Sequence, residues 1–421
     1  MFADRFHNKR TSFVTVLKPC PFEFALSRRP LLNPVFVDTS FLSPIILYKE
    51  QIVLLTNRTD CSKIFLLRGG NIMQQRFKEL SNYNVFSKHR QFLMGVATLF
   101  IGIFHLDFFA PVAMHKYPVV YETVGTLYIG VEIFLFLSGI GLYFAYSKKP
   151  QFKTYYIKRV ISVYCVFLLI NLPYAFFKNY IYSDNGFKAF VFNELSFSYW
   201  TRPPGETRPG WYVVFIMIIY LIYPLIFKAL SAFNDSKHDL VFTISLCLIF
   251  IFICIFLNEK YSDFYFVVEI GLSRIPIFII GCYVGKQVYN KKQIPPLMYF
   301  LMILGILIKM FYYVSNEKTL LFNRMSQCFF SVAVMFFLII LAEFLVPEKI
   351  YKFFEFFGTM SLEFYLTHNF LKDVIKYYGF TRIRHYFLML LIAFALSFVI
   401  SRLRIKAVKC YLGKKSKEHV L

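Results

Sequence analysis

Hydrophobic residues occur in long, nearly uninterrupted blocks along most of this chain, and not in short alternating runs. Blocks of about 20 apolar residues predict α-helices that cross a lipid bilayer. A membrane β-barrel would instead show alternating segments of about ten residues. We therefore predict an all-α fold, a polytopic membrane bundle of about ten transmembrane helices. The predicted spans are 91–111, 122–146, 160–178, 211–228, 239–257, 264–286, 295–314, 325–346, 357–376 and 385–403.

One predicted span differs from the others because it is interrupted by four polar residues, namely Glu363, His368, Lys372 and Asp373. Ionisable side chains within a bilayer are costly unless they face protein or a water-filled cavity. We expect this helix to turn its polar side toward other helices. The longest connection, 178–210, ends in TRPPGETRPGW, where proline and glycine disfavour a regular helix. We expect it to form a loop over the outer mouth of the bundle.

Residues 1–72 form an N-terminal extension of different character, mixing charge, proline and short apolar patches without a convincing span. One interpretation is a disordered cytoplasmic tail. The other, which we favour, is that translation begins at Met73. Either way, residues 73–421 hold all ten predicted spans and form the membrane domain.

The composition supports a membrane protein and also explains the charge. Hydrophobic residues make up 57% of the 421 positions, above the roughly 45–50% of ordinary soluble domains. The net charge of +23 could suggest nucleic acid, but Lys and Arg gather between the apolar blocks. One set of alternate connections holds 23 of them and the other set holds 11. The positive-inside rule then predicts that both termini are cytoplasmic. We expect the protein in the inner (plasma) membrane, with lipid as the partner of the basic residues and no nucleic acid.

The eight cysteines indicate neither a disulfide framework nor a metal site. None of them forms a CxxC pair, and five lie in apolar blocks, where a thiol behaves as a small hydrophobe. We therefore expect no bound metal.

Arg90 and His105 lie at opposite ends of the first apolar block, and both residue types suit chemistry within a membrane. On one helix they would be roughly 22 Å apart along the axis and about 60° apart around it, so both could face one cavity. Arginine suits phosphate groups, and histidine suits a general base. The alternative is an arginine that snorkels to the interface and a structural histidine.

The second block, GVEIFLFLSGIGLYF, contains an acid and several small residues. Glu132 could orient or charge-balance His105, or it could be an exposed acid at the outer interface. We interpret Ser138, Gly139 and Gly141 as positions that allow close helix packing.

Five further residues are candidates for the site. Lys158 and Arg159, at the mouth of the third block, could hold phosphates or anchor the helix in the interface. Arg274 within the sixth block requires an anionic partner, either in a functional role or in a structural ion pair. Trp211 and Tyr212 begin the fourth block, where an aromatic belt is the usual role, but they could also bind substrate.

Five stretches resemble the integral-membrane acyltransferase 3 family, whose members typically acylate sugars of the cell envelope. They are MGVATLFIGIFH, GVEIFLFLSGIGLYF, WYVVFIMIIYLIYPL, RIPIFIIGCYVGK and FFGTMSLEFYLTHNF. Their order and spacing cover about 90–376. The resemblance implies a ten-helix fold with acyl-CoA as the donor at the cytoplasmic face.

The resemblance also implies site residues, with two departures from the family pattern. It assigns catalytic roles to Arg90, His105 and Glu132, and donor binding to a basic pair that includes Arg159. The family often has its arginine eleven positions before the histidine, where this chain has Met94. Its RxxR pattern is broken here, because Ser162 follows Arg159 by three positions and leaves Lys158 as a substitute.

Together these features predict a membrane O-acyltransferase that moves an acyl group, expected to be acetyl, from acyl-CoA to an envelope glycan or lipid-linked sugar. His105 would act as general base or briefly accept the acyl group itself. We expect Arg90, Lys158 and Arg159 to bind the donor, and Trp211, Tyr212, Arg274 and His368 to bind the acceptor. The alternatives are a transporter or flippase, which intramembrane Arg, His and Glu also suit, and a membrane protein without catalysis.

Overall fold

The structure is a computed structural model that describes residues 73–108, 116–148, 151–183, 186–199, 210–232, 236–315, 319–380 and 382–418. Across these residues the chain is helical, and the one β-bridge joins Asn82 to Gln293. The main helices are α3 (Asn84–Lys88), α4 (Arg90–Phe104), α6 (Pro118–Thr126), α7 (Gly130–Ser147), α8 (Phe152–Arg159), α9 (Cys165–Phe176), α10 (Gly186–Glu194), α11 (Trp211–Ser231), α12 (Ser236–Lys260), α13 (Ser262–Leu272), α14 (Ile275–Tyr289), α15 (Pro296–Val314), α16 (Leu320–Phe344), α17 (Glu348–Gly358), α18 (Ser361–Tyr377) and α19 (Ile383–Glu418).

Eight continuous helical segments in the described residues are long and apolar enough to cross a membrane. They include three longer units in which short helices join end to end, 118–147, 152–182 and 262–289. The two remaining predicted spans are helical as well, but α4 has 15 residues and the polar α18 has 17. The prediction of an all-α, polytopic membrane bundle is therefore confirmed.

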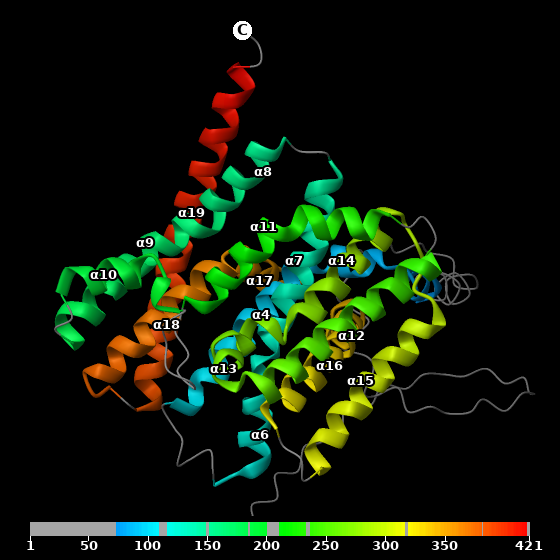
Figure 1. Cartoon of the computed structure of the whole chain (residues 1–421), viewed down its shortest axis with the longest axis horizontal. Helices are drawn as coiled ribbons and strands as arrows, with labels where there is room; N and C mark the ends of the chain where they lie inside the picture. Colours follow the sequence, from blue (N-terminus) through cyan, green and yellow to red (C-terminus); the bar gives the residue numbers. More distant parts are fainter. Residues whose placement is uncertain are drawn as a thin grey trace, which may run out of the picture. The chain divides into compact units, whose positions relative to one another are not determined.

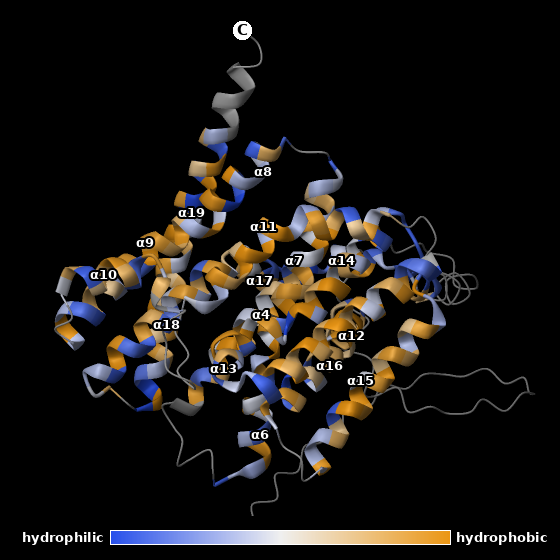
Figure 2. Ribbon diagram, viewed as in Figure 1, coloured by the Kyte–Doolittle hydropathy of each residue, from blue (hydrophilic) through white to orange (hydrophobic). Residues whose placement is uncertain are grey.

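The apolar helices divide into inner and outer ones by how much of each is covered by protein. In 118–147 and 262–289 the most apolar window is 72% and 78% buried, but in 237–260 and 296–314 only 22%. Figure 2 shows hydrophobic residues all along α12 and α15, the helices of this second group. We interpret their uncovered apolar surface as the part of the bundle that meets lipid.

Two inner helices, α7 and α14, pack with their backbones in close contact (Figure 1). A Cβ atom added at Gly139 would lie 2.6 Å from the carbonyl oxygen of Phe278, and one added at Gly281 would overlap the Phe136 carbonyl. No larger residue fits at either contact. The expected packing role of Gly139 is thus confirmed, and this contact fixes the centre of the bundle.

The polar side of α18 faces protein, as its sequence predicts. Glu363 is fully buried and accepts a hydrogen bond of 2.5 Å from Arg404 of α19. Thr367 lies 2.8 Å from Ser397 of the same helix, oxygen to oxygen. His368 is also fully buried, so α18 carries its polar residues into the bundle.

The connection predicted as a loop over 178–210 is partly wrong. Its first part continues the preceding helix to Tyr182, and α10 then forms before a short turn at Phe197–Tyr199. Only the segment TRPPGETRPGW contains the helix-breaking residues, and 200–209 lie outside the described residues, as does the extension 1–72.

Candidate functional site

A cavity of about 390 Å³ opens at the start of α4. Arg90 from α4 and Arg159 from α8 both line it, and Tyr220 of α11, Ser138 of α7 and Ser87 of α3 complete its polar lining. Residues from five helices therefore converge here, and the structure brings Arg90 and Arg159 together in one cavity. The full lining is Ser87, Arg90, Ser138, Ile140, Gly141, Leu142, Phe144, Ala145, Arg159 and Tyr220.

Both arginines present buried donors without acceptors. The Nε atoms of Arg90 and Arg159 are buried and have no hydrogen-bond partner in the described part of the chain. Arg159 is held by aromatic rings instead, with its guanidinium carbon 5.4 Å from the Tyr155 ring centre and 5.3 Å from that of Tyr220. Since an unsatisfied buried donor is costly, two of them in one cavity favour an anionic ligand with several oxygen atoms.

Gly141 and Lys158 lie differently from what the sequence suggested. A Cβ at Gly141 would be 3.3 Å from Nη2 of Arg90, so the glycine makes room for the guanidinium and not for a neighbouring helix. Ser138 likewise faces the cavity. Lys158 is exposed and is not among the described residues that line the cavity. The structure therefore places only Arg159, and not its neighbour Lys158, at the cavity.

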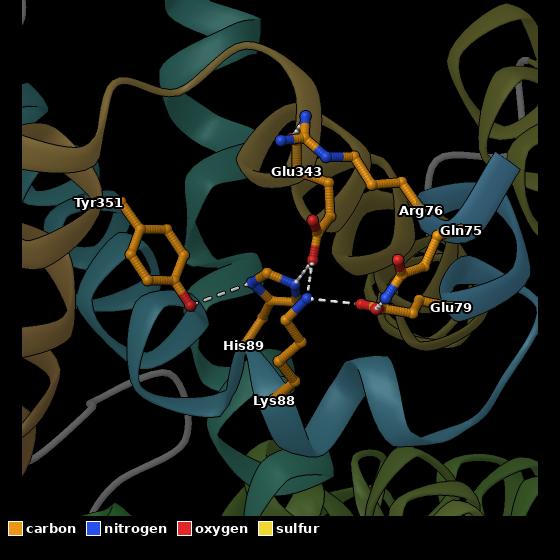
Figure 3. Close-up of polar contacts among 7 residues, drawn as sticks. All are labelled: Gln75, Arg76, Glu79, Lys88, His89, Glu343 and Tyr351. Carbon is orange, nitrogen blue, oxygen red and sulfur yellow. Dashed lines mark hydrogen bonds and ion pairs between the residues drawn. The ribbon is translucent and has the colours of Figure 1, made fainter. Parts of the chain in front are cut away.

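The residue before Arg90 fixes the start of α4 through a polar cluster, shown in Figure 3. His89 is 2% exposed, and its Nε2 lies 2.7 Å from Glu343 of α16. Its Nδ1 lies 3.1 Å from the hydroxyl of Tyr351 on α17. Lys88 donates to Glu343 at 2.6 Å and to Glu79 at 2.9 Å.

These bonds also affect the charge of Lys88. Partial burial favours its neutral amine, but the hydrogen bonds to Glu343 and Glu79 outweigh burial and raise the pKa of Lys88 above its ordinary value. Lys88 thus stays charged near neutral pH, and the cluster ties the first turn of α4 to two other helices.

At the other end of α4, two histidines form a pair. The α-helix ends at Phe104, and His105 begins a short 3₁₀ turn. The expectation that Arg90 and His105 lie on one continuous α-helix is therefore wrong. Nδ1 of His105 lies 3.0 Å from Nε2 of His368 on α18. Nδ1 of His368 lies 2.7 Å from the carbonyl oxygen of Phe364, one turn earlier. His368 therefore contacts the proposed base directly.

Aromatic side chains connect the cavity to the histidine pair. Tyr212 of α11 interacts with Ser138 in the cavity lining. Its ring centre is 5.5 Å from that of Tyr365, which lies 6.0 Å from the ring of His368. Contacts between neighbouring side chains therefore lead from one end of α4 to the other.

Glu132 has a different partner from the one expected. Its Oε1 accepts a hydrogen bond of 2.7 Å from Nε of Arg274, and the two side chains are 0% and 2% exposed. The interpretation of Glu132 as an exposed interfacial acid is wrong, and its ion pair is with Arg274 and not with His105. Arg274 thereby has the anionic partner that its burial requires.

Trp211 and Tyr212 are buried in the bundle at 6% and 9% exposure, so the aromatic-belt interpretation is wrong for both. The guanidinium carbon of Arg274 lies 5.4 Å from the ring centre of Trp211 and 5.7 Å from that of Tyr128. Trp211 thus belongs to the surroundings of the Glu132–Arg274 ion pair, and Tyr212 belongs to the path between cavity and histidines.

Nothing in the sequence singles out Tyr220, Tyr128 or Tyr365 among the 30 tyrosines of the chain. Only the contacts between helices identify them.

Comparison with known proteins supports an enzyme of the membrane. The family described as "Acyltransferase domain", acyltransferase 3, matches residues 92–402. No curated protein and no solved structure matches the chain. The matched region extends from α4 to α19 and contains His105, His368 and the Glu132–Arg274 pair. With its apolar helices and this match, the chain belongs to the acyltransferase 3 family and is a membrane acyltransferase that transfers groups other than amino-acyl groups.

Proposed function

We propose that this protein transfers an acyl group, acetyl in the simplest case, from acyl-CoA to a hydroxyl of a cell-envelope carbohydrate. The single observation that carries the proposal is the cavity in which Arg90 and Arg159 meet with unpartnered guanidinium nitrogens. The nucleotide part of acyl-CoA carries several phosphate groups, and guanidinium groups bind phosphate oxygens through paired donors.

The length of α4 suits such a donor. Arg90 and His105 are the first residue of α4 and the residue after its last, which places them roughly 22 Å apart along the axis at about 1.5 Å per residue. The phosphates would lie at the Arg90 end and the thioester near His105. Ser138, Tyr212 and Tyr365 form successive contacts between the two ends, and we propose that they would contact the extended arm of the donor.

The transfer itself requires a base. The hydroxyl oxygen of the acceptor attacks the thioester carbonyl as the ring of His105 removes the hydroxyl proton. The carbon–sulfur bond then breaks, and the thiolate of CoA leaves and takes up that proton. General-base assistance of this kind contributes on the order of 10²–10⁴-fold in rate. A brief acyl-histidine intermediate on His105 is the alternative route to the same products.

The proposed orientation places the two substrates on opposite sides of the membrane. The loops with more Lys and Arg would be cytoplasmic, which puts both termini and the arginine cavity inside the cell, in the inner membrane. The acceptor, a glycan or lipid-linked sugar, would approach the His105 end from outside. Arg274 and Trp211 are the residues we propose to lie nearest to its path.

The test is transfer from radiolabelled acetyl-CoA by the purified full-length protein in detergent. An extract of envelope carbohydrate serves as the acceptor, and the product ester is located by mass spectrometry. We expect label in the carbohydrate and one CoA thiol released per ester formed. The His105→Ala variant should yield a folded protein without transfer. If the wild-type protein labels no carbohydrate, or if His105→Ala labels it normally, the proposal is wrong.

A further inference from the structure

The two hydrogen bonds of His368 determine which nitrogen of its ring carries the proton. A carbonyl oxygen only accepts hydrogen bonds, so the 2.7 Å contact with Phe364 requires a proton on Nδ1 of His368. In the neutral ring the lone pair then lies on Nε2. Protonation of both nitrogens would instead place a positive charge on the His368 side chain, which is fully buried.

The same logic passes to His105. Since Nε2 of His368 holds a lone pair, the 3.0 Å contact must be a hydrogen bond donated by Nδ1–H of His105. In neutral His105 the lone pair is then on Nε2, the nitrogen on the far side of the ring from His368. The Phe364 carbonyl thus favours one proton position on each of two consecutive imidazole rings.

The position of His368 is itself constrained. The Phe364 ring stacks on it, with centres 5.3 Å apart and planes at 16°. Tyr365 packs edge-on at 6.0 Å. With one nitrogen bonded to Phe364 and the other to His105, both nitrogens of His368 are engaged, so His368 is not suited to attack a thioester itself.

From this geometry we infer that His368 is a positioning residue, which holds His105 in the tautomer that presents Nε2 as the base. This inference rests on the proposed function for its kinetic consequence and changes the expected role of His368 from acceptor binding to orientation of the base. His368 would also stabilise the protonated form of His105 during the reaction. When His105 takes up the hydroxyl proton, its Nδ1–H bond to His368 becomes charge-assisted and therefore stronger. The relation is that of the carboxylate to the histidine in a Ser-His-Asp triad, here with a neutral partner.

A second acceptor also lies against His105, the backbone carbonyl of Ile101 one turn earlier on α4. A side-chain substitution at 368 leaves that carbonyl unchanged. Two variants of one position therefore separate the contributions. His368→Phe removes the acceptor but keeps a planar ring against Phe364, and His368→Gln offers an amide oxygen close to where Nε2 lies.

The first measurement is steady-state transfer by full-length protein in detergent, with wild type, His368→Phe, His368→Gln and the exposed-site control His238→Phe. We expect kcat to fall about 10- to 100-fold in His368→Phe, the usual effect of losing an orienting partner. The KM for acetyl-CoA should change less than threefold, and His368→Gln should recover at least part of kcat. The inference would be overturned if KM changed as much as kcat in both variants. It would also be overturned if His368→Phe kept the wild-type kcat.

The second measurement reads the tautomer without any reaction. In protein labelled with ¹⁵N-histidine, the His105 resonances are assigned by their loss in His105→Ala. We expect the pattern of a ring protonated at Nδ1 in wild type and in His368→Gln, and a shift toward the Nε2-protonated form in His368→Phe. An unchanged pattern in His368→Phe would show that Ile101 alone sets the tautomer. This measurement needs no substrate, so it tests the tautomer even if the wild-type protein transfers no acyl group. Absence of transfer would contradict the proposed function but not the tautomer of His105.

Discussion

Glu132 and Arg274 form a buried ion pair, 2.7 Å from oxygen to nitrogen, although 141 residues separate them in the chain. Arg274 also donates to the Ile270 carbonyl at 2.5 Å and is flanked by two aromatic rings. The second oxygen of Glu132 is buried without a hydrogen-bond partner in the described residues. Each charge thus depends chiefly on the other, which makes this pair a sensitive point of the fold.

Removing one charge should destabilise the protein strongly. Glu132→Gln leaves the buried guanidinium uncompensated, and we expect the free energy of unfolding to fall by about 3–5 kcal/mol. Thermal and denaturant unfolding in detergent, followed by tryptophan fluorescence, measure this. The double variant Glu132→Gln with Arg274→Met should lose less than the sum of the two single changes.

The matched control for the ion pair is Lys352→Gln. Its side chain is 69% exposed and pairs with Glu348 four residues earlier on α17. Exposed pairs of this kind contribute about 0–1 kcal/mol, so little change is expected. If Glu132→Gln unfolds no earlier than Lys352→Gln, the buried pair does not support the fold as argued.

The arginine cavity should govern the affinity for the donor. Arg90→Gln and Arg159→Gln each remove a charge-assisted bond of about 1.5–3 kcal/mol, which corresponds to roughly a 10- to 100-fold rise in the KM for acetyl-CoA. The kcat at saturation should change little. Lys158→Gln serves as the control, because its side chain is exposed and is not among the cavity residues. A rise in KM for Lys158→Gln equal to that for Arg159→Gln would contradict the assignment.

The close contact of α7 and α14 predicts a large difference between two glycines. Gly281→Ala would force a methyl group onto the Phe136 carbonyl, whereas nothing lies within 4 Å of a Cβ at Gly125. We expect Gly281→Ala to cost about 1–3 kcal/mol of unfolding free energy, as overpacking does. Gly125→Ala should be neutral or slightly stabilising. Equal melting temperatures for the two variants would mean that the helices separate easily.

The cluster around His89 should affect the donor indirectly. His89→Leu removes the bonds to Glu343 and Tyr351 that hold the first turn of α4, where Arg90 begins the helix. We expect about 1–3 kcal/mol less stability and a KM for acetyl-CoA raised less than by Arg90→Gln. The exposed His238→Leu variant is the control in the same assays. An effect on kcat with an unchanged KM would place His89 in a different role.

The pattern of apolar blocks was sufficient to predict the helices of this protein. A bilayer segment must satisfy every backbone group internally, so a long apolar block has one regular solution, the α-helix. The polar residues of 357–376 predicted that α18 turns them toward protein, because ionisable side chains are costly in lipid. Arg90, Arg159 and His105 could be singled out because charge and imidazole are rare in such blocks.

The partners of those residues were decided by the tertiary structure. The sequence left Glu132 as either a partner of His105 or an exposed interfacial acid, but the close packing of α7 against α14 places it beside Arg274. His368 reaches His105 across 263 positions, and Lys158 turns away from the cavity that Arg159 lines. The sequence by itself determined which polar residues in the apolar blocks must have a partner or a function. The tertiary structure decided what that partner is, because it depends on which helices touch. Those contacts are set by glycine contacts and ring packing between segments far apart in the chain, and periodicity within one segment carries no information about them.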